Sequence, residues 1–447
     1  MSFIKERLKR VKLNPPRVLA LGFGSLILIG AILLNLPIAT QNGESIGFIN
    51  ALFTSASAVC VTGLVVVNTG EFWSLFGQII IILLIQMGGL GFMTMATIGA
   101  LIIGKKITLK ERLIIKEQLN QETMSGLVKL TKYVILSTFV IEGIGALLLS
   151  TRFIPIYGRV KGIWFSVFHA ISAFCNAGFD LTGDSIAPFV GDFIINMTIA
   201  SLIILGGLGF SVYIDVSRNK SLKKLSLHSK LVLSITGILI LVGMIMIFLI
   251  EYNNPLTLKP LNVFEKLLAS FFQSVIPRTA GYYSVNLAGL YDTTVFLMII
   301  LMFIGGSPGS TGGGIKTTTF GTLILTTIGV IRGDKDIVAF RKRISYDVIN
   351  RSLAIATVGM ILILGVSFVL TVTEPANFLD VLFETTSAFA TVGLTRGLTP
   401  NLTHFGKIMI ILTMYIGRVG PLTMAYVFAR KSRHSNFRYS EGNIMVG

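Results

Sequence analysis

Residues 302–320 read MFIGGSPGSTGGGIKTTTF and could bind phosphate, because glycine-rich loops that end in Lys-Thr cradle nucleotides. The template G-x-x-x-x-G-K-[ST] is nearly met over residues 309–317, but Ile315 separates the last glycine from Lys316. A phosphate loop also follows a strand of an α/β unit, whereas long apolar stretches flank this segment. The glycines therefore need another explanation, which depends on the rest of the chain.

A second glycine pattern occurs four times. Each copy begins with phenylalanine, carries a glycine ten residues later and continues with a large apolar residue. The copies are FTSASAVCVTGL at 53–64, FHAISAFCNAGF at 168–179, FFQSVIPRTAGY at 271–282 and FETTSAFATVGL at 383–394. Successive copies begin 115, 103 and 112 residues apart, which indicates a fourfold internal repeat.

The end of each copy could bind a dehydrated monovalent cation. Glycine can adopt positive φ and turn backbone carbonyls into a path that a side chain would obstruct. Four such turns can form a ring of carbonyls that replaces the hydration shell of the ion. The candidate filter segments are Val61, Thr62 and Gly63; Asn176, Ala177 and Gly178; Thr279, Ala280 and Gly281; and Thr391, Val392 and Gly393. Tight helix crossings also use glycine, but they would not fix a phenylalanine ten residues upstream.

The composition indicates a polytopic membrane protein. Of the 447 residues, 53% are hydrophobic and only 13% are charged, and the mean hydropathy is +0.79. About 20 apolar residues cross the hydrocarbon core as a helix. Eight long apolar stretches flank the four copies, at residues 17–38, 73–103, 127–150, 193–216, 230–250, 293–331, 349–372 and 407–429. The first stretch is full length and no cleavage site precedes it, so we expect it to be retained.

Each copy of the glycine pattern is too short to cross the bilayer and return as helices. Backbone without helical pairing is tolerated at that depth only where protein or water surrounds it. We therefore predict an all-α polytopic membrane protein with eight transmembrane spans. Four pseudo-symmetric repeats, each made of a helix, a re-entrant pore helix and a helix, surround one central pore.

Basic residues predict the orientation of the chain. Of the 38 Lys and Arg residues, 28 fall in five segments, at 1–17, 105–132, 218–230, 332–351 and 430–438. Cytoplasmic loops carry such an excess, so both termini are expected in the cytoplasm. Because the net charge of +17 follows this pattern, it does not indicate nucleic-acid binding.

The predicted organisation alternates cytoplasmic segments with repeats. The cytoplasmic segments are the N-terminus (1–16), loops at 104–126, 217–229 and 332–348, and the C-terminal tail (430–447). The repeats span 17–103, 127–216, 230–331 and 349–429. Two cysteines, Cys60 and Cys175, and four scattered histidines give neither a disulfide framework nor a metal-ligand spacing, so we expect no metal apart from the ion at the filter.

Every second span contains a glycine-rich break. The breaks lie at residues 88–92, 206–210, 305–309 and 417–421. As one straight helix, 293–331 would be roughly 58 Å long against a hydrocarbon core of ~30 Å. We therefore expect an unwound intramembrane loop at residues 305–315.

Because unpaired backbone at this depth must face water or protein, the intramembrane loop is expected to cross the pore beneath the filter and to act as a gate. A packing kink and a phosphate site are the alternatives. The candidate gate residues are Gly305, Gly306, Ser307, Gly309, Ser310, Thr311, Gly312, Gly313, Gly314, Lys316 and Arg418.

Three charged residues within the membrane region are further candidates. Arg418 would either repel cations or cap carbonyls of the intramembrane loop. Glu142 would be either functional or a satisfied structural acid. Arg278 is expected to pair with Glu384 or Asp380 behind the filter, or otherwise to snorkel at the outer surface.

These motifs resemble a known family. Residues 391–393 are similar to the K⁺-channel filter, and the fourfold unit with one glycine per repeat resembles the Trk/Ktr/HKT superfamily of potassium transporters. The chain length, the Ser-Ala-x-x-x-x-Gly filters and the GRVGP motif at 417–421 most resemble KtrB-type membrane subunits of Ktr potassium-uptake systems.

The resemblance implies a K⁺-selective, channel-like subunit of the cell membrane rather than an enzyme. It implies K⁺ as the transported ion, Na⁺ as an activator and no cofactor held by this chain. It also implies a homodimer with one pore per subunit, contact with membrane lipid, and a cytosolic nucleotide-binding regulatory ring (an RCK subunit) as partner.

An alternating-access secondary transporter, a K⁺ or Na⁺ symporter, is the alternative function. Helices broken at mid-membrane are also typical of that class. Its repeats are usually inverted, however, whereas the repeats here share one orientation and contain two spans each. The absence of clustered His, Asp or Glu in the spans weakens the case for a membrane enzyme.

Overall fold

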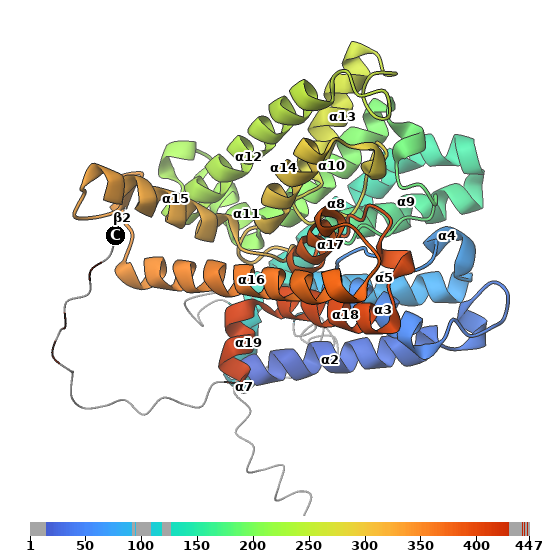
Figure 1. Cartoon of the computed structure of the whole chain (residues 1–447), viewed down its shortest axis with the longest axis horizontal. Coiled ribbons are helices and arrows are strands. Elements are labelled where there is room, and N and C mark those ends of the chain that lie inside the picture. The colour runs from blue at the N-terminus through green and yellow to red at the C-terminus, as the bar shows by residue number, and fades with distance from the viewer. Residues whose placement is uncertain are drawn as a thin grey trace, which may run out of the picture.

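A computed structural model describes residues 15–91, 94, 109–118, 127–428, 440, 442 and 445, and this part of the chain is mostly helical (Figure 1). The expected N-terminal segment 1–16, the loop at 104–126 and the tail at 430–447 lie wholly or largely outside the described residues. The end of the first glycine break, Phe92, also lies outside them.

Each repeat begins with a long apolar helix. These helices are α2 (Pro15–Leu34), α8 (Leu127–Tyr157), α12 (Leu227–Glu251) and α16 (Tyr346–Thr373). All four are long and apolar enough to cross a membrane. They also expose large apolar side chains, such as Leu136 of α8 and Phe368 of α16, so they form the lipid-facing perimeter of the bundle.

A short helix follows each long one and ends at a filter segment. These pore helices are α3 (Phe48–Cys60), α9 (Arg159–Phe174), α13 (Val263–Val275) and α17 (Phe378–Ala390). The 13 residues of α13 span roughly 20 Å, which is less than the hydrocarbon core. A reciprocal capping box starts α13, in which Asn262 and Glu265 each accept the backbone N–H of the other.

The second helix of each repeat is interrupted after its first half. The first halves are α5 (Leu75–Leu90), α10 (Phe193–Leu208), α14 (Asp292–Phe303) and α18 (His404–Val419). The described second halves are α11 (Phe210–Asn219), α15 (Thr317–Arg332) and α19 (Pro421–Phe428). Gly91, Gly209 and Gly420 end the first halves of repeats 1, 2 and 4 with φ of 80°, 89° and 97°, which is backbone that residues with a side chain rarely adopt.

The number of membrane spans remains a prediction. In the described part of the chain, four uninterrupted helices meet the length and hydropathy expected of a span. A fifth span results if α10 and α11 are taken together, although they are bent by 92°. In the other repeats, the glycine breaks leave second helices that are shorter than a usual membrane-spanning helix. The predicted count of eight spans therefore depends on treating each broken helix as one span.

Contacts between the helices arrange the repeats in a ring. The second helix of each repeat packs against the pore helix of the next: α5 on α9, α10 on α13, α14 on α17 and α18 on α3. The last pairing joins repeat 4 to repeat 1 and closes the ring. Lys407 of α18 strengthens this closure, because its Nζ donates to Asn50 Oδ1 of α3 at 3.0 Å.

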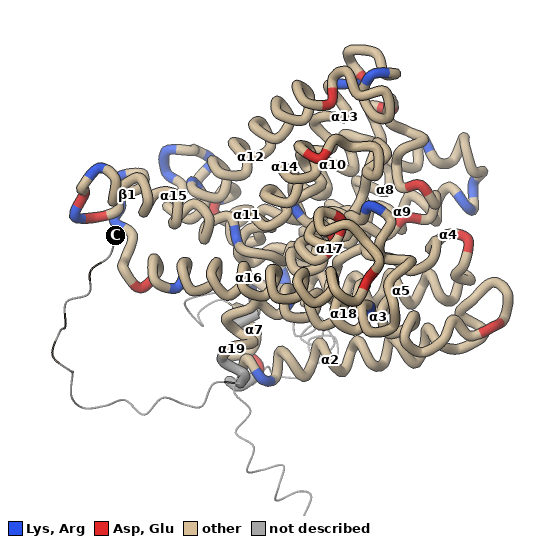
Figure 2. The backbone as a smooth tube through the Cα atoms, in the orientation of Figure 1, with Lys and Arg blue, Asp and Glu red and all other residues tan. Residues whose placement is uncertain are grey.

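Short elements lie between these helices, both within and between the repeats. They are η1 (Pro37–Ala39), α4 (Thr69–Phe72), α7 (Leu109–Gln118), η2 (Ala187–Phe189), η3 (Leu222–Lys224), η4 (Leu287–Gly289), η5 (Thr399–Asn401) and the antiparallel strands β1 (Val338–Ala339) and β2 (Lys342–Arg343). Lys and Arg gather around β1, at the adjoining end of α15 and in the loop between α11 and α12, at one edge of the bundle (Figure 2).

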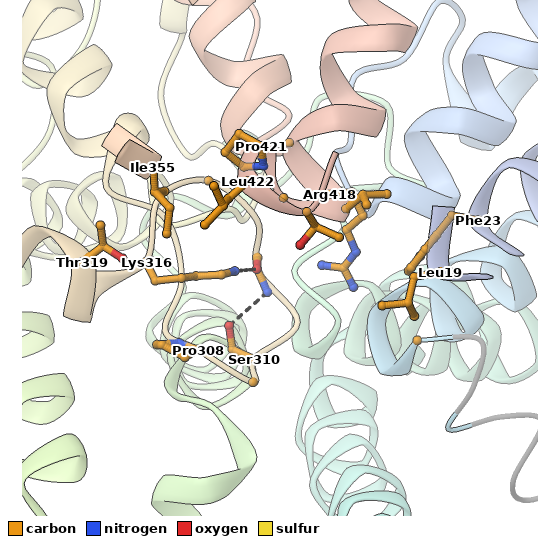
Figure 3. Close-up of a pocket in the computed structure, with 18 of the residues that line it drawn as sticks. Leu19, Phe23, Pro308, Ser310, Lys316, Thr319, Ile355, Arg418, Pro421 and Leu422 are labelled. Carbon is orange, nitrogen blue, oxygen red and sulfur yellow. Dashed lines mark hydrogen bonds between the residues drawn. The ribbon is translucent and has the colours of Figure 1, made fainter. Parts of the chain in front are cut away.

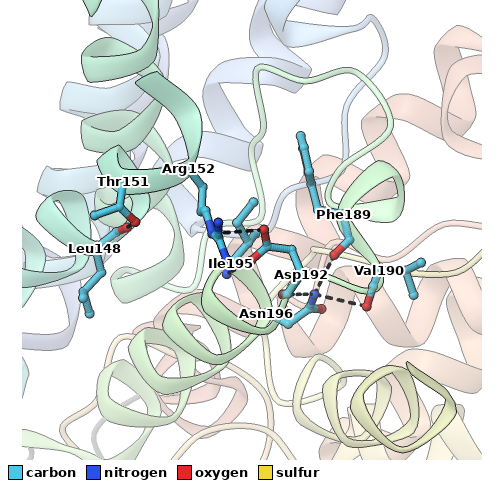
Figure 4. A network of polar contacts seen from close by, with 8 residues as sticks. All are labelled: Leu148, Thr151, Arg152, Phe189, Val190, Asp192, Ile195 and Asn196. Carbon is cyan, nitrogen blue, oxygen red and sulfur yellow. Dashed lines mark hydrogen bonds and ion pairs between the residues drawn. The ribbon is translucent and has the colours of Figure 1, made fainter. Parts of the chain in front are cut away.

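A polar network fixes the loop before α10 (Figure 4). Arg152 of α8 forms an ion pair with Asp192 at 3.2 Å, and Asp192 also accepts the Ile195 N–H at the start of α10. The Asn196 side chain donates to the Phe189 and Asp192 carbonyls at 2.7 and 2.8 Å. The network therefore ties α10 to α8 within repeat 2.

Candidate ion filter and gate

The four filter segments share an unusual backbone. Their first residues are Val61, Asn176, Thr279 and Thr391, with left-handed φ between 52° and 72°. The glycines two residues later have φ between 68° and 95°. In an ordinary strand successive carbonyls point in opposite directions. Left-handed φ at every second residue turns them toward the same side.

Carbonyls of one filter segment face the glycine of the next. The pairs are Gly63 with Ala177, Gly178 with Ala280, Gly281 with Val392 and Gly393 with Thr62. A Cβ added to any of these glycines would lie 3.1 Å or less from the carbonyl oxygen of its partner. The four segments therefore contact one another in a closed ring, and a side chain at any of the four glycines would collide with the neighbouring segment.

Hydrogen bonds from the pore helices hold the filter segments. Ser57 Oγ accepts the Gly63 N–H, and Ser387 Oγ accepts the Gly393 N–H, both at 3.1 Å. In repeat 2 the hydroxyl of Ser172 donates to the Phe179 carbonyl at 2.8 Å. Repeat 3 has Val275 at the matching position, so its side chain cannot form such a bond.

The intramembrane loop is closed at its base. The Gly305 N–H donates to the Ile315 carbonyl at 2.9 Å, and the Thr317 N–H donates to the Gly306 carbonyl at 3.2 Å. Ser307 Oγ and Thr317 Oγ1 are hydrogen-bonded at 2.9 Å. The base is thus a small hydrogen-bonded unit, and the residues between 307 and 314 project from it.

The tip of the intramembrane loop lies against the filter. A Cβ on Gly312 would meet Thr279 Oγ1 at 2.5 Å, and one on Gly313 would meet Thr391 Oγ1. Both threonines are the first residues of filter segments, so the loop contacts the end of the filter nearest the pore helices. Only residues without a side chain fit there.

The other side of the intramembrane loop is bonded to repeat 2. Ser307 N–H donates to the Gly207 carbonyl at 2.9 Å, and Thr311 N–H and Oγ1 both donate to the Gly206 carbonyl. Thr311 Oγ1 also lies 3.3 Å from the Phe174 carbonyl at the end of pore helix α9. The loop therefore bridges from repeat 2 across to filter segments 3 and 4.

Arg418 joins the intramembrane loop to two further repeats. From the end of α18 its NH1 donates to the Thr311 carbonyl, and its NH2 donates to the carbonyls of Gly88 and, at 3.2 Å, Gly89. One guanidinium thus connects repeats 1, 3 and 4 beneath the filter. A planar group with several fixed donors suits this role, which a lysine could not fill.

A cavity of about 260 Å³ borders the intramembrane loop, and Pro308, Ser310 and Lys316 lie among its lining residues (Figure 3). Arg418, Lys316 and Arg351 line it, together with apolar residues such as Phe23 and Leu422. Lys316 Nζ donates to the Gly312 carbonyl at 2.6 Å. Three basic side chains therefore line this cavity.

The structure corrects the expectation for Arg278. Its side chain is buried, and its NH1 donates to the Thr236 carbonyl of α12 at 3.4 Å. Asp380 pairs instead with Arg396 at 2.6 Å. Glu384 accepts hydrogen bonds from Thr395 and Thr399. Arg278 neither pairs with these carboxylates nor snorkels, because α12 covers it.

Glu142 lies behind filter segment 2. It accepts from Gln86 Nε2 at 3.1 and 3.3 Å, and Cys175 Sγ lies 3.8 Å away. Cys60 and Cys175 are both buried free thiols. Within the described ranges, no three His, Cys, Asp or Glu side chains are grouped as a metal site would require.

In the sequence, the serines behind the filter appear as part of the Ser-Ala-x-x-x-x-Gly motif, but the motif alone does not predict their hydrogen bonds. A signal was present, since serine precedes the filter glycine by six residues in repeats 1, 2 and 4. The contact that each serine makes depends on the fold, since Ser57 and Ser387 accept a glycine N–H whereas Ser172 donates to a carbonyl. The sequence gives no comparable indication for Gln86, because its hydrogen-bond partner Glu142 is 56 residues away.

Comparisons with known proteins agree on one family. The model of the TrkH family, described as cation transport protein, matches residues 23–439. The chain is 48% identical to Ktr system potassium uptake protein B of Bacillus subtilis over 448 residues, with all of both chains covered. It is 45% identical to potassium/sodium uptake protein NtpJ of Enterococcus hirae, again over all of both chains.

The fold has a solved counterpart. The crystal structure of the potassium transporter TrkH from Vibrio parahaemolyticus aligns with a TM-score of 0.71 and 17% sequence identity. The alignment covers 94% of this chain and 86% of the other. The likeness supports the predicted all-α membrane fold.

Proposed function

The chain belongs to the TrkH family of cation transport proteins, and from this premise we propose that it is the K⁺-selective, channel-like membrane subunit of a Ktr-type potassium uptake system. Membership confirms the predicted superfamily and class: the protein is a membrane-embedded ion transporter and not an enzyme. The K⁺ preference, the gate and the regulation described below are proposals.

The closed ring of filter segments carries the proposal. Carbonyls of all four segments meet at this ring, and in the proposal they replace the water that a K⁺ ion loses on entry. The four pore helices end at this ring, so the negative ends of their dipoles favour a cation there. A membrane potential then drives the ion, at ~2.3 kcal/mol per charge and 100 mV.

The intramembrane loop and Arg418 act as the gate in this proposal. The loop lies directly against filter segments 3 and 4, and the charge of Arg418 opposes a cation that leaves the filter. Opening requires the tip to move away from the threonines. Its hydrogen bonds to Gly206 and Gly207 and to Arg418 would break or shift in that step.

In this proposal, the protein is regulated and assembled as the family resemblance implies. A homodimer in the cell membrane, with both termini in the cytoplasm, presents the basic segments to a cytosolic nucleotide-binding ring. Na⁺ promotes uptake, in keeping with a relative named for potassium and sodium. The names of other relatives refer to a Ktr system, which is consistent with a separate regulatory subunit.

Alternating access remains the second candidate, because the broken second helices are typical of secondary transporters. In that mechanism halves of the protein would rock around a central site. The cyclic packing of each second helix on the next pore helix favours a fixed pore instead.

Ion uptake in cells that lack their own K⁺ uptake tests the function. Expression of this chain should restore growth at low K⁺ and give K⁺ uptake in preference to Na⁺, and a co-expressed ring subunit should increase the rate. Uptake that is strictly coupled to a second ion at fixed stoichiometry would favour the symporter. A chain that reaches the membrane and moves neither K⁺ nor Na⁺ would refute both.

Replacing Ser387 with alanine should weaken K⁺ preference. The Gly393 N–H would lose its acceptor, and an unsatisfied buried donor costs about 1–3 kcal/mol. A filter segment held less firmly should discriminate less well between ions of different radius. We expect the ratio of K⁺ to Na⁺ uptake to fall about tenfold, since ~1.4 kcal/mol is a factor of ten.

Thr385→Val is the matched control for Ser387→Ala. It removes a hydroxyl from the same pore helix, but that hydroxyl bonds to the Val381 carbonyl within the helix. Its uptake ratio should stay at the wild-type value. Equal ratios in the two variants would show that the serine does not support the filter.

A further inference from the structure

A lateral groove opens on repeat 3, away from the filter and the intramembrane loop. It lies between α12 and α15, and the β1–β2 hairpin forms one end of it. Its volume of about 400 Å³ falls within the roughly 300–1,000 Å³ of small-molecule pockets. The walls are apolar, and Ile238 and Ile324 are 59% and 45% exposed.

Close packing at Gly321 gives the groove its floor. A Cβ on Gly321 of α15 would collide with the Cδ1 methyl of Ile235 on α12. Ile235 of α12 therefore packs directly on Gly321 of α15, and both residues line the groove.

The end of the groove at the hairpin is strongly basic. Residues 332–343 contain five basic and two acidic residues, and one of the acids, Asp336, is paired with Arg343 at 2.8 Å. Arg341 and Lys342 are exposed. Lys230, in the first turn of α12, places its Nζ 6.0 Å from the ring centroid of Phe340, which lines the groove. Figure 2 shows these charges at the edge of the bundle.

The turn that carries this basic rim is strained. Ala339 pairs with Lys342, so Phe340 and Arg341 form a two-residue hairpin turn, with φ of 48° and 64°. Such turns favour Asn-Gly, because residues with bulky side chains adopt left-handed φ at a cost. A strained conformation that places an aromatic ring at the groove and an arginine beside it suggests a functional use of both side chains.

We propose that the groove binds one anionic phospholipid, with an acyl chain between α12 and α15 and the phosphate at Lys230, Arg341 and Lys342. A phospholipid combines an apolar chain with an anionic head, which matches an apolar wall that ends in basic side chains: Lys230 donates to the Lys223 carbonyl at 2.7 Å, and none of the three forms an ion pair with a carboxylate of the described residues. A second copy of this chain matches less well, since it would bring another set of basic side chains to the same edge.

A lipid in this groove would contact α15, the helix that directly follows the intramembrane loop. Phe320 and Gly321, which line the groove, lie only four and five residues after Lys316. The bound lipid would therefore act as a wedge between α12 and α15. The lipid proposal itself does not depend on the ion that the protein transports.

Retention of lipid by the purified full-length protein tests the proposal. The protein is reconstituted in vesicles of equimolar phosphatidylcholine and phosphatidylglycerol, extracted in mild detergent and washed, and the lipid per chain is measured by mass spectrometry. Wild type should retain phosphatidylglycerol over phosphatidylcholine. Arg341→Gln with Lys342→Gln should lower the retained phosphatidylglycerol at least fivefold, since each basic residue near the surface contributes about that factor.

A second variant tests the apolar part of the site. Ile324→Trp fills the groove without changing charge, and it should also release the phosphatidylglycerol. The matched controls are Lys220→Gln with Lys224→Gln, which remove two charges outside the groove, and Leu364→Trp, which adds a tryptophan on the exposed face of α16. Both controls should retain lipid as wild type does.

Three results would overturn the lipid site. Equal loss of phosphatidylglycerol in the charge variant and its control would indicate general surface attraction. Unchanged retention in Ile324→Trp would show that no chain occupies the groove. A change in oligomeric mass of Ile324→Trp without loss of lipid would identify a second copy as the occupant.

Discussion

Deleting residues 308–313 should raise K⁺ flux severalfold and reduce its dependence on a cytosolic ring, while K⁺ preference over Na⁺ is largely retained. The deletion removes the tip that contacts Thr279 and Thr391 but leaves the base bonded from Gly305 to Ile315. Each ~1.4 kcal/mol taken from the barrier would raise the rate about tenfold. Uptake of both ions, with and without the ring subunit, measures the effect.

The result separates a gate from a packing element. If the intramembrane loop is mainly structural, its deletion should lower the amount of protein in the membrane and leave the flux per molecule unchanged. Flux is therefore normalised to the protein that reaches the membrane. A normally folded deletion variant with wild-type flux and wild-type dependence on the ring would reduce the loop to a packing kink.

Arg418→Ala should raise flux in the same direction, but by less than the deletion. It removes one positive charge and the donors to the Thr311, Gly88 and Gly89 carbonyls, while the tip of the loop stays in place. Combined with the deletion it should be sub-additive, because Thr311 is then absent and the pair no longer interacts.

Arg351→Ala serves as the control for charge, since Arg351 lines the same cavity. If Arg418 acts through its contacts, Arg351→Ala should change flux less and should be additive with the deletion. Equal changes in flux for Arg418→Ala and Arg351→Ala would show that the positive charge in the cavity limits the flux and that the hydrogen bonds of Arg418 do not.

Replacing Gly393 with alanine should lower the ratio of K⁺ to Na⁺ uptake by tenfold or more. The added Cβ would collide with the Thr62 carbonyl oxygen, and φ of 90° is strained for any residue with a side chain. One quarter of the ring must then move. Because the four carbonyls act together, discrimination should fall more than total uptake.

Gly365→Ala is the matched control for Gly393→Ala. Gly365 lies in α16, with no atom within 4 Å of an added Cβ, and alanine should even favour this helix by roughly 0.5–1 kcal/mol. Its ion preference should equal that of wild type. A wild-type ratio in Gly393→Ala would argue against a carbonyl filter at this position.

Much of this protein could be predicted from its sequence because membrane spans and internal repeats are local patterns. Apolar stretches of sufficient length predict helices in a bilayer, and the four Phe-to-Gly segments predict four turns of one kind. The length of residues 293–331 predicts a break in that helix, and the structure has non-helical chain from Ile304 to Lys316 between α14 and α15.

The same local reasoning failed at Arg278. A buried arginine near two acidic residues of the next repeat was expected to pair with one of them. The structure instead pairs Asp380 with Arg396, which lies only 16 residues away, and gives Arg278 a backbone carbonyl of α12. The acceptor that a charged side chain reaches depends on how its helix is oriented in the fold. The amino-acid composition does not specify that orientation.

The class, the repeat and the glycine positions follow from the sequence, whereas the contacts between distant filter and gate residues follow from the tertiary fold. Gly393 faces Thr62, and Arg418 reaches Gly88 across 330 residues, because repeat 4 packs on repeat 1 and closes the ring. Local patterns specify helices and turns through neighbouring residues. Contacts between distant repeats depend on how all four repeats pack together, so no single segment of the sequence can specify them.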